Sequence, residues 1–148
     1  MSNRPVIADE PGPGLSYKEK SLWFSLLSTI AVYAYYFWQA LSIGDGDPER
    51  VAELFLGIVV AFVILQIVVH IALALHHEPE PTDERDKRVA MRGAQLAYHV
   101  LMAGLWTSLS VAALSLGTFW FAHAALLAIV LAELARYASQ LYFYRGGA

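Results

Sequence analysis

The sequence contains no cysteine, and this excludes several kinds of structure and chemistry. It can form no disulfide framework, no zinc site built from thiolates and no cysteine-ligated iron–sulfur cluster. It also lacks a phosphate-binding glycine loop, an HExxH helix and a GxSxG nucleophile turn. We therefore assign no catalytic residue and expect a protein that is not an enzyme.

Charged residues are scarce, at 16% of the chain against roughly 25% in an average soluble domain. The net charge of −3 is too small to indicate direct binding to nucleic acid. Hydrophobic residues make up 57% of the chain and are gathered in four long blocks. This arrangement favours a membrane protein, whose main partner is the lipid bilayer.

Each apolar block is long enough to cross a bilayer as a helix, which takes about 20 residues. A soluble bundle would need a polar face on each helix, and residues 59–65 have none. We therefore predict an all-α integral membrane four-helix bundle over residues 18–148, after a disordered cytoplasmic tail at residues 1–17. The predicted spans are residues 22–43, 54–75, 96–116 and 118–144.

The connections between the blocks predict the topology. Short connections can join only neighbouring helices, so we expect an up-down-up-down arrangement. Eight of the ten lysines and arginines lie on the side of the termini and the middle loop, and Arg50 lies alone on the other side. This bias predicts that both termini face the cytoplasm. We expect a multi-pass protein of the bacterial inner (plasma) membrane that associates with itself as a homo-oligomer.

Several polar residues interrupt the spans at a similar depth, in the cytoplasmic half. An ionisable residue inside a membrane normally faces a partner or a cavity. One interpretation is a polar network, in which Glu133 pairs with Arg136 on the same helix. A second is a pocket for a small or lipid-like ligand. The residues of this network or pocket are Gln66, His70, Gln95, His99, Glu133, Arg136 and Gln140.

A third interpretation of the polar residues at this depth is a metal or haem site. His70 and His99 would face each other and ligate the metal, with Glu133 as a third ligand, because imidazole and carboxylate suit zinc, iron or manganese. His123 lies near the other end of its span and is interpreted as a packing or interfacial histidine. Gly93 and Gly104 are predicted to be close contacts between helices.

The stretch HHEPEPTDERDKR, residues 76–88, is the most charged part of the chain. Pro79 and Pro81 are expected to end the second helix, because proline cannot continue it. Asp83 and Glu84 are expected to cap the next helix, where acidic residues complement the helix dipole. We interpret residues 76–92 as a cytoplasmic connection and contact surface, with His76 and His77 at the membrane interface rather than on a metal.

Three segments carry a resemblance to a known family: SYKEKSLWFSLLSTIAVYAYYFW, DERDKRVAMRGAQLAYHVL and AELARYASQLYFYRGG. The chain resembles an uncharacterised family of small four-span bacterial membrane proteins with EKS–Trp, DERD and Glu…Arg-Tyr…Tyr-Arg-Gly motifs. The C-terminal motif of this chain differs slightly from the family pattern, because Arg-Gly-Gly stands where two arginines are expected. The matching positions are Glu19, Lys20, Ser21, Trp23, Asp83, Glu84, Arg85, Asp86, Glu133, Arg136, Tyr137, Gln140, Tyr144 and Arg145.

Similar proteins are often encoded beside small helix-turn-helix repressors, so the resemblance implies a cytoplasmic regulator as a partner. The first functional hypothesis is a non-enzymatic sensory, regulatory or interaction protein. It would have a polar pocket in its cytoplasmic half and would contact the partner through Asp83, Glu84, Arg85 and Asp86. The alternatives are a metal- or haem-binding redox protein that uses His70 and His99, and a small-molecule or ion transporter that works as an oligomer.

Overall fold

A computed structural model describes residues 16–76, 83–114 and 116–146 of the chain. The described residues form four long helices and no strand, which confirms the all-α prediction. All four helices are long and apolar enough to cross a membrane. They are α1 (Tyr17–Ile43), α2 (Pro48–His76), α3 (Glu84–Ala113) and α4 (Thr118–Arg145), with a short 3₁₀ turn, η1 (Gly44–Gly46), after α1.

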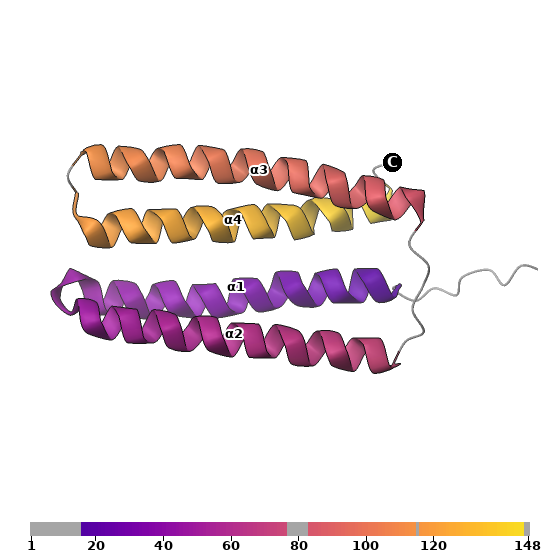
Figure 1. Cartoon of the computed structure of the whole chain (residues 1–148), viewed down its shortest axis with the longest axis horizontal. Helices are drawn as coiled ribbons and strands as arrows, with labels where there is room; N and C mark the ends of the chain where they lie inside the picture. Colours follow the sequence, from indigo (N-terminus) through magenta and orange to yellow (C-terminus); the bar gives the residue numbers. More distant parts are fainter. Residues whose placement is uncertain (1–15, 77–82, 115, 147–148) are drawn as a thin grey trace, which may run out of the picture.

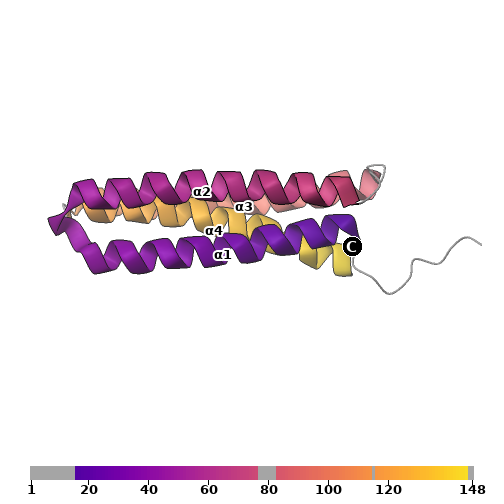
Figure 2. The same cartoon turned by 90° about the horizontal axis from the view of Figure 1, so that it is seen from below.

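The helices form two antiparallel hairpins, α1–α2 and α3–α4, which are joined where α1 packs against α4. In Figure 1, α3 and α2 lie at opposite edges of the molecule, and Figure 2 shows the α1–α2 hairpin from the side. α1 and α3 begin at the end of the molecule where α2 and α4 finish. We call this the terminal end, and the opposite end, with η1 and Gly117, the turn end.

Three helices begin before the predicted membrane spans. α1 begins at Tyr17 and α2 at Pro48, ahead of residues 22 and 54, and α3 begins at Glu84, as the expected cap before residue 96 implies. The backbone N–H of Arg50 donates to Asp47 Oδ1 over 3.1 Å, and proline is favoured at a first helical position. These first turns are polar, so hydropathy alone does not detect them.

The start of α3 carries the predicted acidic cap. Asp83 is the N-cap, and its side chain and that of Asp86 form a reciprocal capping box, which confirms the role of Asp83. Residues 84–92 of the predicted 76–92 loop are therefore helical, and residues 77–82 lie outside the described residues. Of the predicted N-terminal tail, residues 1–15 also lie outside, Ser16 caps α1 and Tyr17 is its first residue.

The α3–α4 hairpin is closely packed through small residues. A Cβ at Gly93 would lie 2.7 Å from the Gln140 Cγ, and a Cβ at Gly104 would overlap Ala128. The Ser108 hydroxyl, which is fully buried, donates to the backbone oxygen of Phe121 over 3.1 Å. The prediction that both glycines mark close helix contacts is confirmed.

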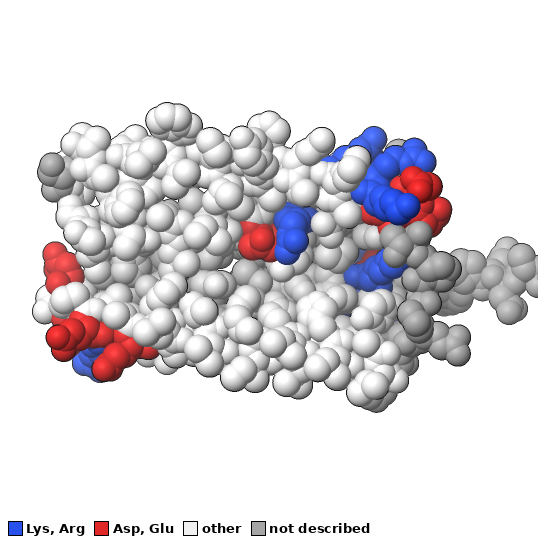
Figure 3. Space-filling view, in the orientation of Figure 1, with Lys and Arg blue, Asp and Glu red and all other residues white. Residues whose placement is uncertain are grey.

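Much of the apolar surface remains uncovered along the helices. Trp38 on α1 is 74% exposed and Leu75 on α2 is 80% exposed, and on α2 the described residues include one buried side chain, Val51. In Figure 3 the charged side chains lie mainly at the two ends, and acidic and basic side chains also lie next to each other between the ends. Such a surface suits lipid rather than water, and the four apolar helices are those of a multi-pass membrane protein.

Candidate functional site

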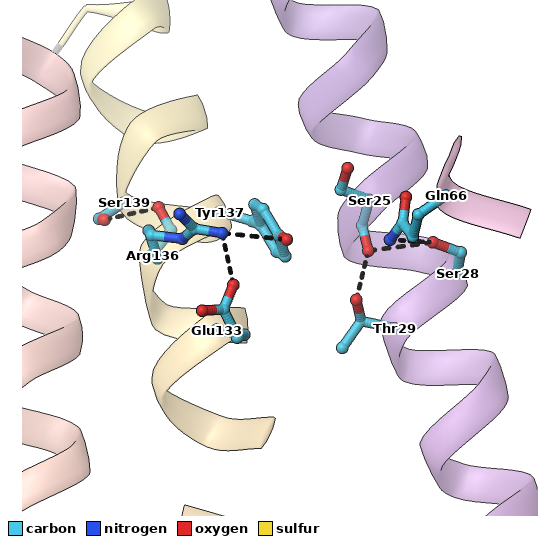
Figure 4. A network of polar contacts seen from close by, with 8 residues as sticks. All are labelled: Ser25, Ser28, Thr29, Gln66, Glu133, Arg136, Tyr137 and Ser139. Carbon is cyan, nitrogen blue, oxygen red and sulfur yellow. Dashed lines mark hydrogen bonds and ion pairs between the residues drawn. The ribbon is translucent and has the colours of Figure 1, made fainter. Parts of the chain in front are cut away.

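The charged residues between the two ends lie on α4 and face α1. The Arg136 guanidinium donates to Glu133 Oε2 over 2.5 Å and to the Tyr137 hydroxyl over 3.2 Å (Figure 4). Its Cζ also lies 4.9 Å from the centre of the Tyr137 ring, a cation–π contact. The predicted pairing of Glu133 with Arg136 on one helix is confirmed.

Opposite this group, the first hairpin presents short polar side chains (Figure 4). Ser25 and Thr29 on α1 are buried, and the Thr29 hydroxyl donates to the backbone oxygen of Ser25 over 2.6 Å. The Gln66 amide nitrogen on α2 reaches the Ser28 hydroxyl over 3.4 Å, which is long for a hydrogen bond. The two hairpins therefore face each other here through polar groups rather than through apolar packing.

One atom from each hairpin is buried here without a hydrogen-bond partner among the described residues. These atoms are Gln66 Oε1 on α2 and Arg136 Nε on α4. A buried polar atom that is left unpaired costs about 1–3 kcal/mol. The interface between the hairpins thus keeps one free acceptor and one free donor, which a polar ligand group or an ordered water would satisfy.

The structure does not bring His70 and His99 together. Both side chains are exposed, on α2 and α3 at opposite edges of the molecule. In each histidine, Nδ1 lies 2.7 Å from the backbone oxygen four residues earlier, and His70 Nε2 lies 3.2 Å from the Ser21 hydroxyl. Within the described residues, no group of three or more His, Asp or Glu side chains could hold a metal. The predicted ligand set of His70, His99 and Glu133 is not assembled.

The other residues predicted to belong to the polar network or pocket have different surroundings. Gln95 is exposed on α3, like His99. Gln140 packs against Gly93, so it contributes to the α3–α4 contact. Of the seven predicted residues, Gln66, Glu133 and Arg136 belong to the interface between the hairpins. We call these three residues, with Ser25, Ser28, Thr29 and Tyr137, the polar site.

A second polar cluster ties three helices together at the terminal end. The Lys18 ammonium on α1 lies 2.5 Å from Asp86 Oδ2 on α3, and the Tyr144 hydroxyl on α4 donates to Asp86 Oδ1 over 2.8 Å. The Arg85 guanidinium also donates to the backbone oxygen of Tyr144 over 3.3 Å. The hydrogen bond from Lys18 lowers the pKa of the Asp86 carboxyl, which lies ten residues before the predicted third span, and partial burial opposes this effect.

A further ion pair extends the cluster between α1 and α4. Arg145 Nε lies 3.6 Å from Glu19 Oε1, and the Arg145 guanidinium lies 5.5 Å from the centre of the Trp23 ring. Residues from all three motifs of the sequence therefore meet at one place. We call Lys18, Glu19, Trp23, Arg85, Asp86, Tyr144 and Arg145 the terminal cluster.

The four residues predicted to contact a partner do not share one role. Asp83 caps α3, and Asp86 is held by Lys18 and Tyr144. Glu84 is exposed and pairs with Lys87 over 2.9 Å, and the Arg85 side chain is also exposed. Asp83 is exposed as well, so Glu84 and Arg85 are the exposed residues of the four that do not cap the helix.

The turn end holds a cavity of about 630 Å³ between α2 and α4, which the sequence did not indicate. His123 lies in its wall and is buried, consistent with the packing histidine expected from the sequence. Its Nδ1 lies 2.8 Å from the Phe119 backbone oxygen, and its Nε2 lies 3.0 Å from the Tyr36 hydroxyl of α1. This contact joins the two hairpins at the turn end.

Comparison of the chain with protein-family models, curated proteins and solved structures finds no match. A function is therefore inferred from the residues and their geometry. The polar site and the terminal cluster both lie between the two hairpins, and α1 and α4 contribute to both.

Proposed function

We propose that this protein is a non-enzymatic sensory or regulatory module of the bacterial inner membrane. It binds a small polar group at the polar site between the hairpins and signals through its terminal end. The observation that carries the proposal is the pair of buried, unpartnered atoms, Gln66 Oε1 and Arg136 Nε, on opposite sides of this interface. Leaving both unpaired costs free energy, and a ligand that pairs with them recovers it.

The chemistry of the two atoms defines what the ligand must offer. Arg136 Nε needs an acceptor and Gln66 Oε1 needs a donor, so a hydroxyl or an amide group can pair with either atom. The charge of Arg136 is already balanced by Glu133 at 2.5 Å, so the site does not demand an anion. We therefore propose a neutral polar ligand group.

The helices that form the polar site also carry the terminal cluster. α1 contributes Lys18 and Glu19, and α4 contributes Tyr144 and Arg145. A ligand between α1 and α4 that binds one spacing of the hairpins better than another would shift the population towards that spacing. The ion pairs at the terminal end would then change, together with the surface that presents Glu84 and Arg85.

The proposed partner is a cytoplasmic regulator, which the family resemblance favours, and the Lys and Arg bias favours a cytoplasmic terminal end where it would bind. We would delete the gene, identify the transcripts that change, and complement with wild type or with variants. Glu84→Ala/Arg85→Ala removes the exposed contact groups and Arg136→Gln alters the polar site, while Val60→Ala on lipid-exposed α2 is the control. Wild type and the control are expected to restore the transcripts, and the other two variants are expected not to.

Equal membrane levels of all variants, measured by immunoblot, are required for this comparison. Full restoration by both the Glu84→Ala/Arg85→Ala variant and Arg136→Gln would reject the proposed signalling role. A deletion that changes no transcript would also reject it.

The proposed orientation can be tested independently, because the chain has no native cysteine. A cysteine at Gly46, which has open space around it, is expected to react with a membrane-impermeant maleimide in intact cells. A cysteine at Arg88, which is exposed on α3, is expected to react only after the membrane is opened. The reverse labelling pattern would reject a cytoplasmic terminal end.

A further inference from the structure

The cavity at the turn end is separate from the polar site and has a different character. Its volume of about 630 Å³ lies within the roughly 300–1,000 Å³ typical of small-molecule pockets. α2 and α4 supply most of its wall, and α1 contributes Tyr36. The side chains that make it apolar include Val51, Ala52, Phe55, Ala122, Leu126 and Ile129.

Among the described residues, the cavity wall has a single charged residue, Asp45 of η1. Its side chain is exposed, and among the described residues its carboxylate has no hydrogen-bond or ion-pair partner. The same end also carries Asp47, Glu49 and Glu53 against one base, Arg50. Figure 3 shows this end as predominantly acidic. The mouth of an apolar cavity is therefore negatively charged.

Aromatic rings add to the attraction for a cation. Tyr36, Phe55 and Phe119 line the cavity, and the Tyr36 and Phe55 ring centres are 6.0 Å apart. The faces of aromatic rings attract cations, because the ring quadrupole is negative there. A neutral His123 with its proton on Nδ1 satisfies both the Phe119 oxygen and the Tyr36 hydroxyl, so the wall needs no positive charge.

We infer that this cavity binds a lipophilic cation, with its apolar body between α2 and α4 and its positive charge near Asp45. The acidic turn end repels anionic amphiphiles of the same size, and an uncharged chain gains nothing from Asp45. This site is distinct from the polar site, and the inference does not rest on the proposed signalling function.

A matched pair of ions tests the charge preference. Tetraphenylphosphonium and tetraphenylborate have nearly the same size and shape and carry opposite charges. Binding of each would be measured by equilibrium dialysis against the full-length protein in zwitterionic nanodiscs, with empty nanodiscs subtracted. Saturable binding of one tetraphenylphosphonium per chain is expected, without saturable binding of tetraphenylborate.

Two variants with matched controls locate the site. Ala122→Trp fills the cavity and is expected to weaken tetraphenylphosphonium binding more than about tenfold, whereas Val60→Trp on exposed α2 is expected to leave it unchanged. Asp45→Asn removes the charge in the wall and is expected to weaken binding about three- to fivefold, the size of an exposed ion pair. Glu53→Gln, which removes a charge outside the wall, is expected to change it less than about twofold.

Several outcomes would overturn the inference. They are equal binding of the two ions, no saturable binding of tetraphenylphosphonium, unchanged binding by Ala122→Trp, and losses of equal size for Asp45→Asn and Glu53→Gln. The Asp45→Asn variant and the comparison of tetraphenylphosphonium with tetraphenylborate both leave the packing intact. They therefore test whether the cavity prefers a cation even if Ala122→Trp fails to insert into the membrane.

Discussion

The two hairpins of this protein differ in how closely their helices pack. α3 and α4 approach each other at Gly93 and Gly104, where even a Cβ would meet the neighbouring helix. In the α1–α2 hairpin, Gly57 has no atom of another element within 4 Å of where its Cβ would lie. α2 therefore adds little to the protein core and offers most of its surface to lipid or to a ligand.

The contacts between the hairpins follow from this difference. The terminal cluster joins α1, α3 and α4 at one end, and the hydrogen bond between Tyr36 and His123 joins α1 and α4 at the other. Between them lies the polar site, with its two unpartnered atoms. The α3–α4 hairpin is thus closely packed, and the polar contacts of α1 link the other hairpin to it.

The largest expected effect on the free energy of unfolding comes from disrupting the closely packed α3–α4 hairpin. In Gly104→Leu, the new side chain would meet Ala128, whose Cα lies 3.0 Å from the Cβ position and cannot rotate away. We expect a loss of about 3 kcal/mol in the free energy of unfolding, the upper end for overpacking. Gly57→Leu is the control on α2 and is expected to change stability little. Thermal unfolding in detergent measures both, and equal losses would contradict the difference between the hairpins.

The next effect concerns the link between the hairpins at the terminal end. Asp86→Asn weakens the contact with Lys18 at 2.5 Å and the bond from Tyr144 at 2.8 Å. We expect a loss of about 1–2 kcal/mol in the free energy of unfolding, because hydrogen bonds to charged groups are the stronger ones. Glu84→Gln removes an exposed pair with Lys87 and is expected to cost less than about 0.5 kcal/mol. A Glu84→Gln loss as large as that of Asp86→Asn would show that the cluster has no special role.

A smaller effect is expected at the turn end. Tyr36→Phe removes the hydroxyl that lies 3.0 Å from His123 Nε2. The expected loss in the free energy of unfolding is about 0.6 kcal/mol, the average measured for hydrogen bonds between membrane helices. Tyr98→Phe, which changes a tyrosine that is 60% exposed, is the control and is expected to have no effect. If Tyr36→Phe costs more than Asp86→Asn, the turn end and not the terminal end holds the hairpins together.

The smallest effect is a dependence of stability on pH. The pKa of Asp86 is lowered in the folded protein from the ordinary value of 3.8, so the folded state binds this proton less readily than the unfolded state does. The resulting stabilisation is present above the ordinary pKa and is lost as the pH falls through the lowered folded value. Unfolding measured from pH 6 to pH 3 should show this loss in wild type, and Asp86→Asn should show less of it. Identical pH profiles would contradict the role of Asp86.

Some of the site was predictable from sequence because it depends on local spacing. Glu133 and Arg136 are three residues apart, so they share one face of a helix and pair wherever that face points. Asp83 was identifiable as a cap because acidic residues at a helix start pair with free backbone N–H groups. The glycine contacts of α3 followed from the need for small residues between membrane helices.

The placement of His70 and His99 was not predictable in the same way. Each shares a helix face with a glutamine four residues earlier, but both side chains are exposed, and His70 contacts Ser21 of α1 rather than His99. In a membrane helix the apolar residues surround the axis, so the hydropathy pattern does not reveal which face points inward. The expectation that every polar residue in a span faces the interior therefore fails for these two histidines.

The sequence by itself determined that the chain forms four long apolar helices, that helices joined by short connections are neighbours, and where α3 is capped, because these properties depend on residues that are close together in the chain. Only the tertiary structure decided that α1 packs against α4, that Lys18, Asp86 and Tyr144 meet, and that a cavity opens beside His123. These features depend on the rotation of each helix about its axis. That rotation is set by close packing against a neighbour, as at Gly104 and Ala128, and not by the order of residues within one helix.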